Sequence, residues 1–102
     1  MYRYRITDAA RQDMKRIAAY IADELYAPES ARRLMEQLRD AFRHACAYPQ
    51  SLPPVKDDLF HALGYRKIIV EHYIAFVLID AEQETVYVAR VLYCGQDYRA
   101  IL

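Results

Sequence analysis

The hydrophobic pattern at the start of the chain predicts a short strand followed by a helix. Residues Tyr2 to Ile6 alternate aromatic or aliphatic side chains with arginine, which is typical of a short strand. Thr7 or Asp8 then offers a side-chain oxygen that can accept from a free backbone N–H at a helix start. Beyond it, apolar residues recur at steps of three and four with charges mostly on the other side, which indicates an amphipathic helix; they are Ala10, Met14, Ile17, Ile21 and Leu25.

A second helix is predicted from Pro28 to Tyr48. Proline suits the first helical turn because its missing N–H has no intrahelical partner there, and Glu29 suits the positive end of the helix dipole. Tyr48 precedes Pro49 and is pushed out of the α region, which ends the helix. The break before Pro28 is short, so the two helices form an antiparallel hairpin. The second apolar stripe is Ala31, Leu34, Met35, Leu38, Phe42 and Ala45.

The period changes to that of strands in the second half of the chain. The segment from Pro49 to Ala62 carries three prolines and is interpreted as a connecting loop. The segments GYRKIIV, YIAFVLI and TVYVARVLY follow, separated by turns at Glu71-His72 and at Asp80 to Glu84. They predict three consecutive antiparallel strands, a meander.

The order strand, helix, helix and three strands predicts an α+β fold (β-α-α-β-β-β). With the helices grouped ahead of an antiparallel run, we expect a two-layer sandwich whose helical hairpin packs on one face of the sheet. A chain of 102 residues has room for one hydrophobic core, so residues 1–102 are expected to form a single domain.

The predicted strands carry more apolar surface than one covered face requires. In the last strand Val86, Val88 and Leu92 would point one way, and the residues between them the other way, namely Tyr87, Ala89, Val91 and Tyr93. Two explanations stay open. Either the C-terminal segment folds over the second face, or a partner segment covers it, because exposed apolar patches mark interaction sites.

Composition and charge narrow the classes of function. With 55% hydrophobic and 27% charged residues the chain is globular, and it lacks the roughly 20 uninterrupted apolar residues of a membrane span. The N-terminus has no secretory pattern, so a cytoplasmic location is expected. The formal net charge is zero, so nucleic-acid contact would require a local basic patch. Cys46 and Cys94 lie far apart without metal-ligand spacing, and we expect neither metal nor cofactor.

An ordered set of segments resembles the RelE/ParE superfamily of toxins from bacterial type II toxin–antitoxin systems. The set comprises the first helix AARQDMKRIAAYI, the second helix from Pro28 to Tyr48-Pro49, the block LGYRKIIVEHYIAF, the strand VYVARVLY and the ending DYRAIL. The resemblance spans essentially the whole chain. It implies a strand, a helical hairpin and a meander, and a cognate antitoxin as partner.

The resemblance leaves two mechanisms to distinguish. RelE-like members cleave mRNA on the ribosome with basic residues on the meander and a C-terminal tyrosine, whereas ParE-like members are associated with inhibition of DNA gyrase. Arg66 and Tyr98 match the nuclease pattern. Ile74 or Ala75 stands where a base is expected on the strand, and the segment after the last strand reads Cys94, Gly95 and Gln96. Because cations that steady the phosphate supply a large part of such catalysis, the ParE-like interpretation is favoured.

Two alternatives stay open beside a gyrase-binding toxin. One is a ribosome-dependent endoribonuclease that uses Arg66, Lys67, Tyr98 and Arg99. The other is a non-toxic, degenerate member, because Gln96-Asp97 stands where related toxins often carry an Arg-Arg or Arg-Asp pair.

The candidate residues for binding a target or an antitoxin are basic and aromatic side chains of the strands and tail. Arg90 lies inside an apolar strand, so it should either pair with a carboxylate such as Asp97 or open onto a binding groove. His72 is interpreted as a turn residue, and Tyr98 could equally plug the core. The full set is Arg66, Lys67, Tyr87, Arg90, Tyr93 and Tyr98.

Overall fold

The sheet holds four strands in the order β1-β4-β3-β2, so the first strand lies beside the last. In the computed structural model, which describes residues 1–96, β1 runs parallel to β4 and the other pairs are antiparallel. This arrangement confirms the predicted α+β class and the meander. The strands are β1 (Arg3–Ile6), β2 (Arg66–Val70), β3 (Tyr73–Asp80) and β4 (Thr85–Tyr93).

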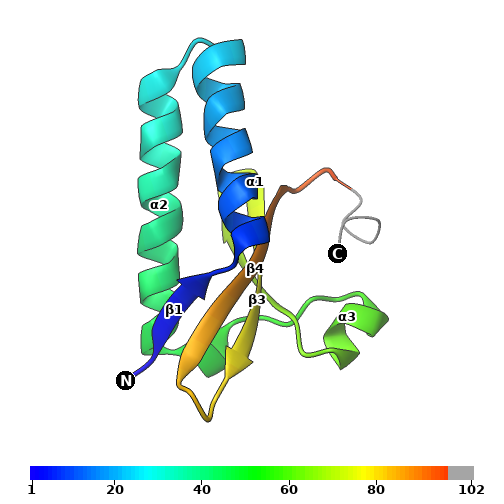
Figure 1. Cartoon of the computed structure of the whole chain (residues 1–102). Coiled ribbons are helices and arrows are strands. Elements are labelled where there is room, and N and C mark those ends of the chain that lie inside the picture. The colour runs from blue at the N-terminus through cyan, green and yellow to red at the C-terminus, as the bar shows by residue number, and fades with distance from the viewer. Residues whose placement is uncertain (97–102) are drawn as a thin grey trace.

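Two helices, α1 (Asp8–Ala19) and α2 (Pro28–Ala47), lie side by side on one face of the sheet (Figure 1). Thr7 caps α1, because its side chain accepts from the backbone N–H of Ala10 at 3.1 Å. Pro28 stands in the first turn of α2, where its missing N–H costs no hydrogen bond. Both helix starts are therefore as the sequence predicts.

The tip of the helical hairpin departs from the predicted pattern. After α1 the chain forms a π-helical turn, η1 (Tyr20–Glu24), in which the N–H of Leu25 donates to the carbonyl of Tyr20, five residues back, at 3.2 Å. The wider turn rotates the apolar stripe away from the core. Leu25, predicted to be the last residue of the buried stripe, is instead 55% exposed.

Tyr26 follows this turn in a left-handed backbone conformation, with φ at 53°. This conformation costs an L-residue about 1–2 kcal/mol, and the side chain of Tyr26 is 88% exposed, so it regains little by packing. We expect Tyr26→Gly to raise the free energy of unfolding by about 1 kcal/mol and the melting temperature by roughly 4–8 °C, measured by thermal denaturation. Tyr20→Gly, at a helical φ of −60°, should lower both. A lower melting temperature for Tyr26→Gly would contradict the prediction.

The main core lies between the helices and the sheet. Phe42 of α2 packs on Tyr4 of β1 with ring centroids 5.6 Å apart, and Val77, Val86 and Val88 of the central strands are fully buried beneath the helices. The alternating strand pattern reaches this core from every strand, as the pleat requires.

A β-bulge in β4 corrects the predicted facing of its residues. The register shifts between Phe76 and Val77, which pair with Arg90 and Val88, so Ala89 is the extra residue. A bulge reverses the side on which the following residues point. Val91 therefore joins the helix-side core, and Leu92 lies in the cluster on the opposite face.

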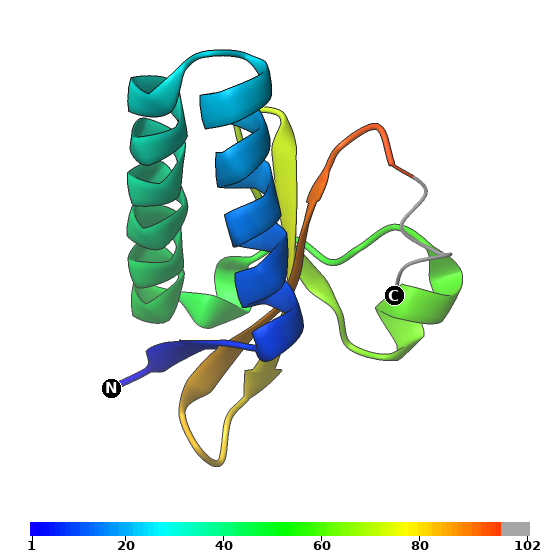
Figure 2. The same ribbon diagram turned by 45° about the horizontal axis from the view of Figure 1, so that its top comes forward.

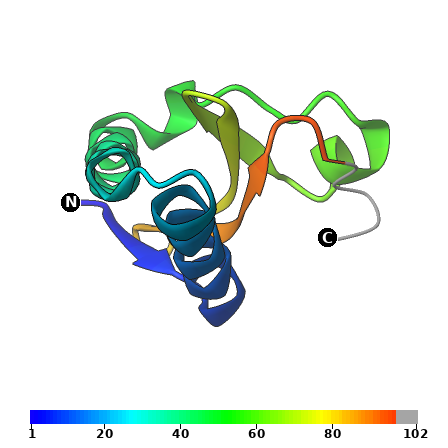
Figure 3. The same ribbon diagram turned by 90° about the horizontal axis from the view of Figure 1, so that it is seen from above.

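Part of the opposite face is covered by the chain itself, through a segment that neither explanation from the sequence named. The predicted loop from Pro49 to Ala62 contains a 3₁₀ turn, η2 (Pro49–Ser51), and a short helix, α3 (Asp58–Ala62). Asp57 caps α3, and the segment places Val55 and Phe60 against Phe76 and Leu92. Figures 2 and 3 show α3 on the other side of the sheet from the paired helices. The prediction of a loop was wrong at α3. Capping by Asp57 and burial of Phe60 stabilise a short helix there, although the segment around it is rich in proline.

Candidate functional site

The edge of β4 beyond β1 is covered by a helix instead of a fifth strand. β1 pairs with residues 85–88 only. Beyond them, Thr7 donates its N–H to the carbonyl of Val88 at 3.1 Å and its hydroxyl to the carbonyl of Ala89 at 2.9 Å. The N–H of Val91 donates to the Asp13 carboxylate at 3.0 Å. Polar groups of α1 and its cap thus satisfy the edge, because buried backbone groups require partners.

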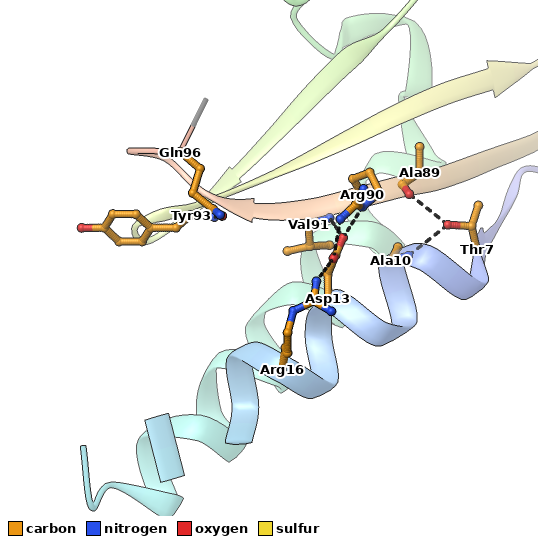
Figure 4. Close-up of polar contacts among 9 residues, drawn as sticks. All are labelled: Thr7, Ala10, Asp13, Arg16, Ala89, Arg90, Val91, Tyr93 and Gln96. Atoms are coloured by element: carbon orange, nitrogen blue, oxygen red, sulfur yellow. Dashed lines mark hydrogen bonds and ion pairs between the residues drawn. The ribbon is translucent and has the colours of Figure 1, made fainter. Parts of the chain in front are cut away.

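Asp13 is the centre of a buried ionic cluster (Figure 4). Its side chain is 1% exposed and accepts from Nε and Nη2 of Arg90 at 2.6 and 2.8 Å. Arg16, one turn further along α1, donates to the same carboxylate at 2.6 Å. The hydrogen bond to Asp13 raises the pKa of Arg90. The cluster therefore combines one carboxylate with two guanidinium groups, which leaves a local excess of positive charge.

A groove of about 940 Å³ opens beside this cluster and is called the β4 groove below. Its helix-side wall consists of Ile17, Tyr20 and Leu25, and its sheet-side wall includes Tyr73 and Tyr93. Arg16 and Arg90 line it between the walls, with His72 and Gln96 also present.

Tyr73 and Tyr93 pack against each other in the β4 groove, and the pKa of Tyr73 is raised there. The rings of Tyr73 and Tyr93 meet edge to face with centroids 5.7 Å apart. Burial raises the pKa of the Tyr73 phenol, and the phenols of Tyr93 and Tyr20 add to the increase. Aromatic walls around arginine side chains are typical of protein-binding surfaces, where tyrosine and arginine dominate the binding energy.

Of the predicted residues, the structure brings Arg90 and Tyr93 together in the β4 groove. Arg66 lies elsewhere, at the start of β2, where its Nη1 donates to the carbonyls of Gln50 and Leu52 at 2.9 Å each. Its guanidinium therefore ties β2 to the segment that follows α2.

Lys67 and Tyr87 lie away from the groove on other parts of the sheet. Lys67 pairs with Phe76 in the register of β2 and β3, and Tyr87 donates its hydroxyl to the side chain of Gln83 at 3.0 Å. Tyr98, Arg99 and Asp97 lie outside the described residues. The carboxylate that the structure supplies to Arg90 is Asp13, a pairing that the sequence interpretation did not name.

Asp13 and Arg16 are charged residues of the β4 groove that sequence reasoning missed, and Tyr20 and Tyr73 are aromatic residues that it missed. A signal was present for Asp13: it lies three residues after Ala10 and four before Ile17, on the apolar stripe of α1 itself. A carboxylate on a buried stripe requires a buried donor. Arg90 is the matching cation inside an apolar strand.

Within residues 1–96, no three His, Cys, Asp or Glu side chains gather closely enough to hold a metal ion. None of the helices there combines the length and the apolar character needed to cross a bilayer.

Comparisons with known proteins agree on the fold. The chromosomal ParDE toxin–antitoxin system of P. aeruginosa contains a chain that matches with a TM-score of 0.74 and 15% identity, covering 91% of this chain and 96% of that one. A chain of the RelBE2 toxin–antitoxin complex of Mycobacterium tuberculosis matches with a TM-score of 0.62 and 23% identity, covering 93% of each. The comparison with curated proteins found no match.

The two matching chains, at 15% and 23% identity, share the fold of this chain. The protein-family model described as the ParE toxin of the type II toxin–antitoxin system parDE matches residues 4–98, nearly the whole chain. The chain belongs to this ParE toxin family.

Proposed function

We propose that this toxin arrests growth by binding a protein target such as DNA gyrase, and that a cognate antitoxin holds it inactive. The observation that carries the proposal is the placement of the two arginines on the meander. The guanidinium of Arg66 donates hydrogen bonds to the carbonyls of Gln50 and Leu52, and the guanidinium of Arg90 donates to the buried carboxylate of Asp13.

These hydrogen bonds of Arg66 and Arg90 disfavour RNA cleavage as the activity of the protein. Cleavage by the 2′-hydroxyl requires a group that takes its proton, an acid for the leaving oxygen and cations that steady the phosphate. A guanidinium directed at carbonyls or a buried carboxylate would have to break those bonds before it met a phosphate. Of the predicted nuclease set, the described part of the chain holds Arg66 and Lys67, and Arg66 is already occupied.

The β4 groove supports action by binding instead. Its apolar walls expose Tyr93 and Leu25, and its arginines are held in place by Asp13. Side chains held in place before binding lose little conformational entropy when a partner docks. We propose that the β4 groove contacts the cellular target.

The antitoxin half of the proposal rests on the family and on the matching structures, both of which are described as toxin–antitoxin systems. A neighbouring reading frame that encodes a DNA-binding domain followed by an amphipathic acidic tail would be the candidate antitoxin.

Induced expression without the antitoxin tests the mechanism. We expect growth arrest with intact transcripts, and inhibition of DNA supercoiling when the purified toxin is added to purified gyrase. Messenger RNA fragments within minutes of induction would support the nuclease alternative and overturn the proposal. Unimpaired growth would identify a non-toxic member.

A matched pair of variants tests the β4 groove. Leu25→Lys introduces a charge at an exposed groove residue, and Leu59→Lys makes the same change on α3, away from the groove; the two leucines are 55% and 63% exposed. We expect Leu25→Lys to weaken binding to the target by about tenfold or more and to relieve growth arrest, whereas Leu59→Lys keeps both. Equal behaviour of the two variants would exclude the groove as the target-binding surface.

A further inference from the structure

The helix-side wall of the β4 groove presents a cation and an aromatic ring one helical turn apart. Arg16 of α1 and Tyr20, the residue that ends α1, both line the groove and lie four residues apart. Tyr20 keeps helical backbone angles, with φ at −60° and ψ at −47°. The two side chains therefore leave the same face of the helix, with their Cβ atoms about 5–6 Å apart. A partner that satisfies both must carry an anion and an apolar side chain at a similar separation.

The carboxylate of Asp13 has no capacity left for such a partner (Figure 4). Its Oδ1 accepts from Arg16 and Arg90, and its Oδ2 accepts from Arg90 and from the N–H of Val91. These donors occupy the lone pairs of both oxygens. The side chain is also only 1% exposed, so an occupant of the groove cannot contact it.

Arg16, in contrast, can be reached by an occupant of the β4 groove. Its side chain is 67% exposed and donates from Nη2 to Asp13 at 2.6 Å. Within residues 1–96, its Nε and Nη1 have no hydrogen-bond partner. The acidic residues of η1, Asp23 and Glu24, do not line the groove. A carboxylate of a partner would therefore gain a charge-assisted hydrogen bond with Arg16 without meeting an exposed carboxylate there.

The apolar surface of the β4 groove is only partly covered by the chain itself. Tyr20, Leu25 and Tyr93 line the groove and are 54%, 55% and 51% exposed. Large apolar side chains that gather half-exposed in one place are typical of an interaction site. An aromatic or large aliphatic side chain of a partner would remove the remaining surface from water.

A protein segment fits these features better than a nucleic-acid strand does. Arg16 and Arg90 supply two guanidinium groups to the groove, and Asp13 offsets the charge of one of them. A strand of nucleic acid is held by a row of cations, because its affinity grows with the number of phosphates that are neutralised. Ile17 and Leu25 add aliphatic surface, which offers no ring for a base to stack on.

We propose that the β4 groove recognises an extended segment of the target in which an acidic side chain lies two residues from an aromatic or large aliphatic one, and that Arg16 selects the acid. Side chains two residues apart in an extended segment point to the same side at a separation of about 7 Å, close to that of Arg16 and Tyr20. The inference rests on the target-binding role proposed above. It adds the chemistry of the contact and a residue that determines specificity.

Two synthetic peptides of matched sequence test this inference on the whole toxin. The first is Phe-Ser-Glu-Ser-Phe with both ends blocked, and the second carries Gln in place of Glu. The symmetric sequence places an aromatic side chain two residues from the tested group in either chain direction. Binding is followed by NMR titration to about 10 mM peptide, and shifts of the rings of Tyr20, Tyr73 and Tyr93 mark the groove.

We expect the Glu peptide to bind about three- to tenfold more tightly than the Gln peptide at about 50 mM salt, and this ratio to fall at about 300 mM salt. Arg16→Gln should bring the ratio to about one, and Arg16→Lys should keep part of it because the charge remains. The control is Arg33→Gln, which removes one exposed cation outside the groove and should leave the ratio unchanged.

The ratio of the two affinities also distinguishes recognition by Arg16 from a purely structural role. If Arg16 only supported the fold, Arg16→Gln would weaken both peptides alike and leave their ratio as it is. That result would overturn the inference, as would equal affinity of the unaltered toxin for the two peptides.

The remaining outcomes separate this inference from the function proposed above. If the peptides behave as expected but the toxin does not inhibit gyrase, the proposed target is wrong and the chemistry of the groove stands. If the toxin inhibits gyrase but neither peptide shifts the groove tyrosines, the inference fails and the target stands. If a short oligothymidylate shifts the same rings at lower concentration than the Glu peptide does, the groove binds nucleic acid and the inference is overturned.

Discussion

Replacing Asp13 by alanine is expected to lower the free energy of unfolding by about 3 kcal/mol. The carboxylate is 1% exposed and accepts from Arg90, from Arg16 and from the N–H of Val91. Its removal would take this acceptor away from the Arg90 guanidinium and from a buried backbone N–H, and removing one partner of a buried hydrogen bond costs more than the bond's net contribution to stability. This expected loss lies at the low end of the range for breaking buried ion pairs because the Arg90 side chain is 19% exposed.

Urea denaturation measures this loss, and Arg16→Ala is the matched control. Arg16 donates to the same carboxylate, but its side chain is 67% exposed, so water replaces the bond and the expected loss is about 0.5 kcal/mol or less. Arg90→Ala should be the more costly of the two arginine changes. If Asp13→Ala costs no more than Arg16→Ala, the buried cluster does not hold α1 against β4.

The pH dependence follows from the direction of the Arg90 shift. The hydrogen bond with Asp13 raises the pKa of Arg90 in the folded state. The contribution of the charged Arg90 to the free energy of unfolding is therefore complete at neutral pH and is lost only as the pH rises through strongly alkaline values. The cost of Arg90→Ala should therefore stay constant from neutral to moderately alkaline pH.

Replacing Phe60 by alanine is expected to cost about 3 kcal/mol, the second largest effect. Phe60 is buried in the cluster of Val55, Phe76 and Leu92, and its ring meets Tyr65 edge to face at 5.9 Å. Without the Phe60 ring, the segment that carries α3 should detach from the sheet and expose Phe76. Detachment limits the loss, because it cannot exceed the free energy with which the segment docks.

Urea denaturation together with binding of a hydrophobic dye measures both consequences of Phe60→Ala. We expect a lower stability and increased dye fluorescence while the main helix-side core stays folded. Leu59→Ala, on the same short helix but exposed, should change the stability by no more than about 0.5 kcal/mol and leave the fluorescence as it is. Unchanged stability and fluorescence in Phe60→Ala would mean that the segment does not cover the sheet.

The candidate site was visible in the sequence only in part. Arg90 and Tyr93 stand out because a cation and an exposed aromatic interrupt an apolar strand, and the structure places both in the β4 groove. Arg66 is singled out by the family resemblance, yet it donates to carbonyls of the segment that follows α2. Residue type identifies a group that needs a partner, but the partner depends on which segments meet.

Features decided by neighbouring residues were determined by the sequence alone. The helix starts at Thr7 and Pro28 follow from hydrogen bonds within one turn, and the two hydrophobic periods follow from helix and strand geometry. The hairpin at Glu71-His72 is equally local. Together these signals define the order of elements and therefore the α+β class.

Features that join distant residues were decided only by the tertiary structure. The pairing of Asp13 with Arg90 spans 77 positions, β1 lies parallel to β4 from the other end of the chain, and Phe60 covers a sheet face that its own segment does not belong to. One extra residue at the β4 bulge exchanged the faces of Val91 and Leu92. Such contacts depend on how whole surfaces fit together, and many pairings satisfy the same local pattern until packing and buried polar groups select one.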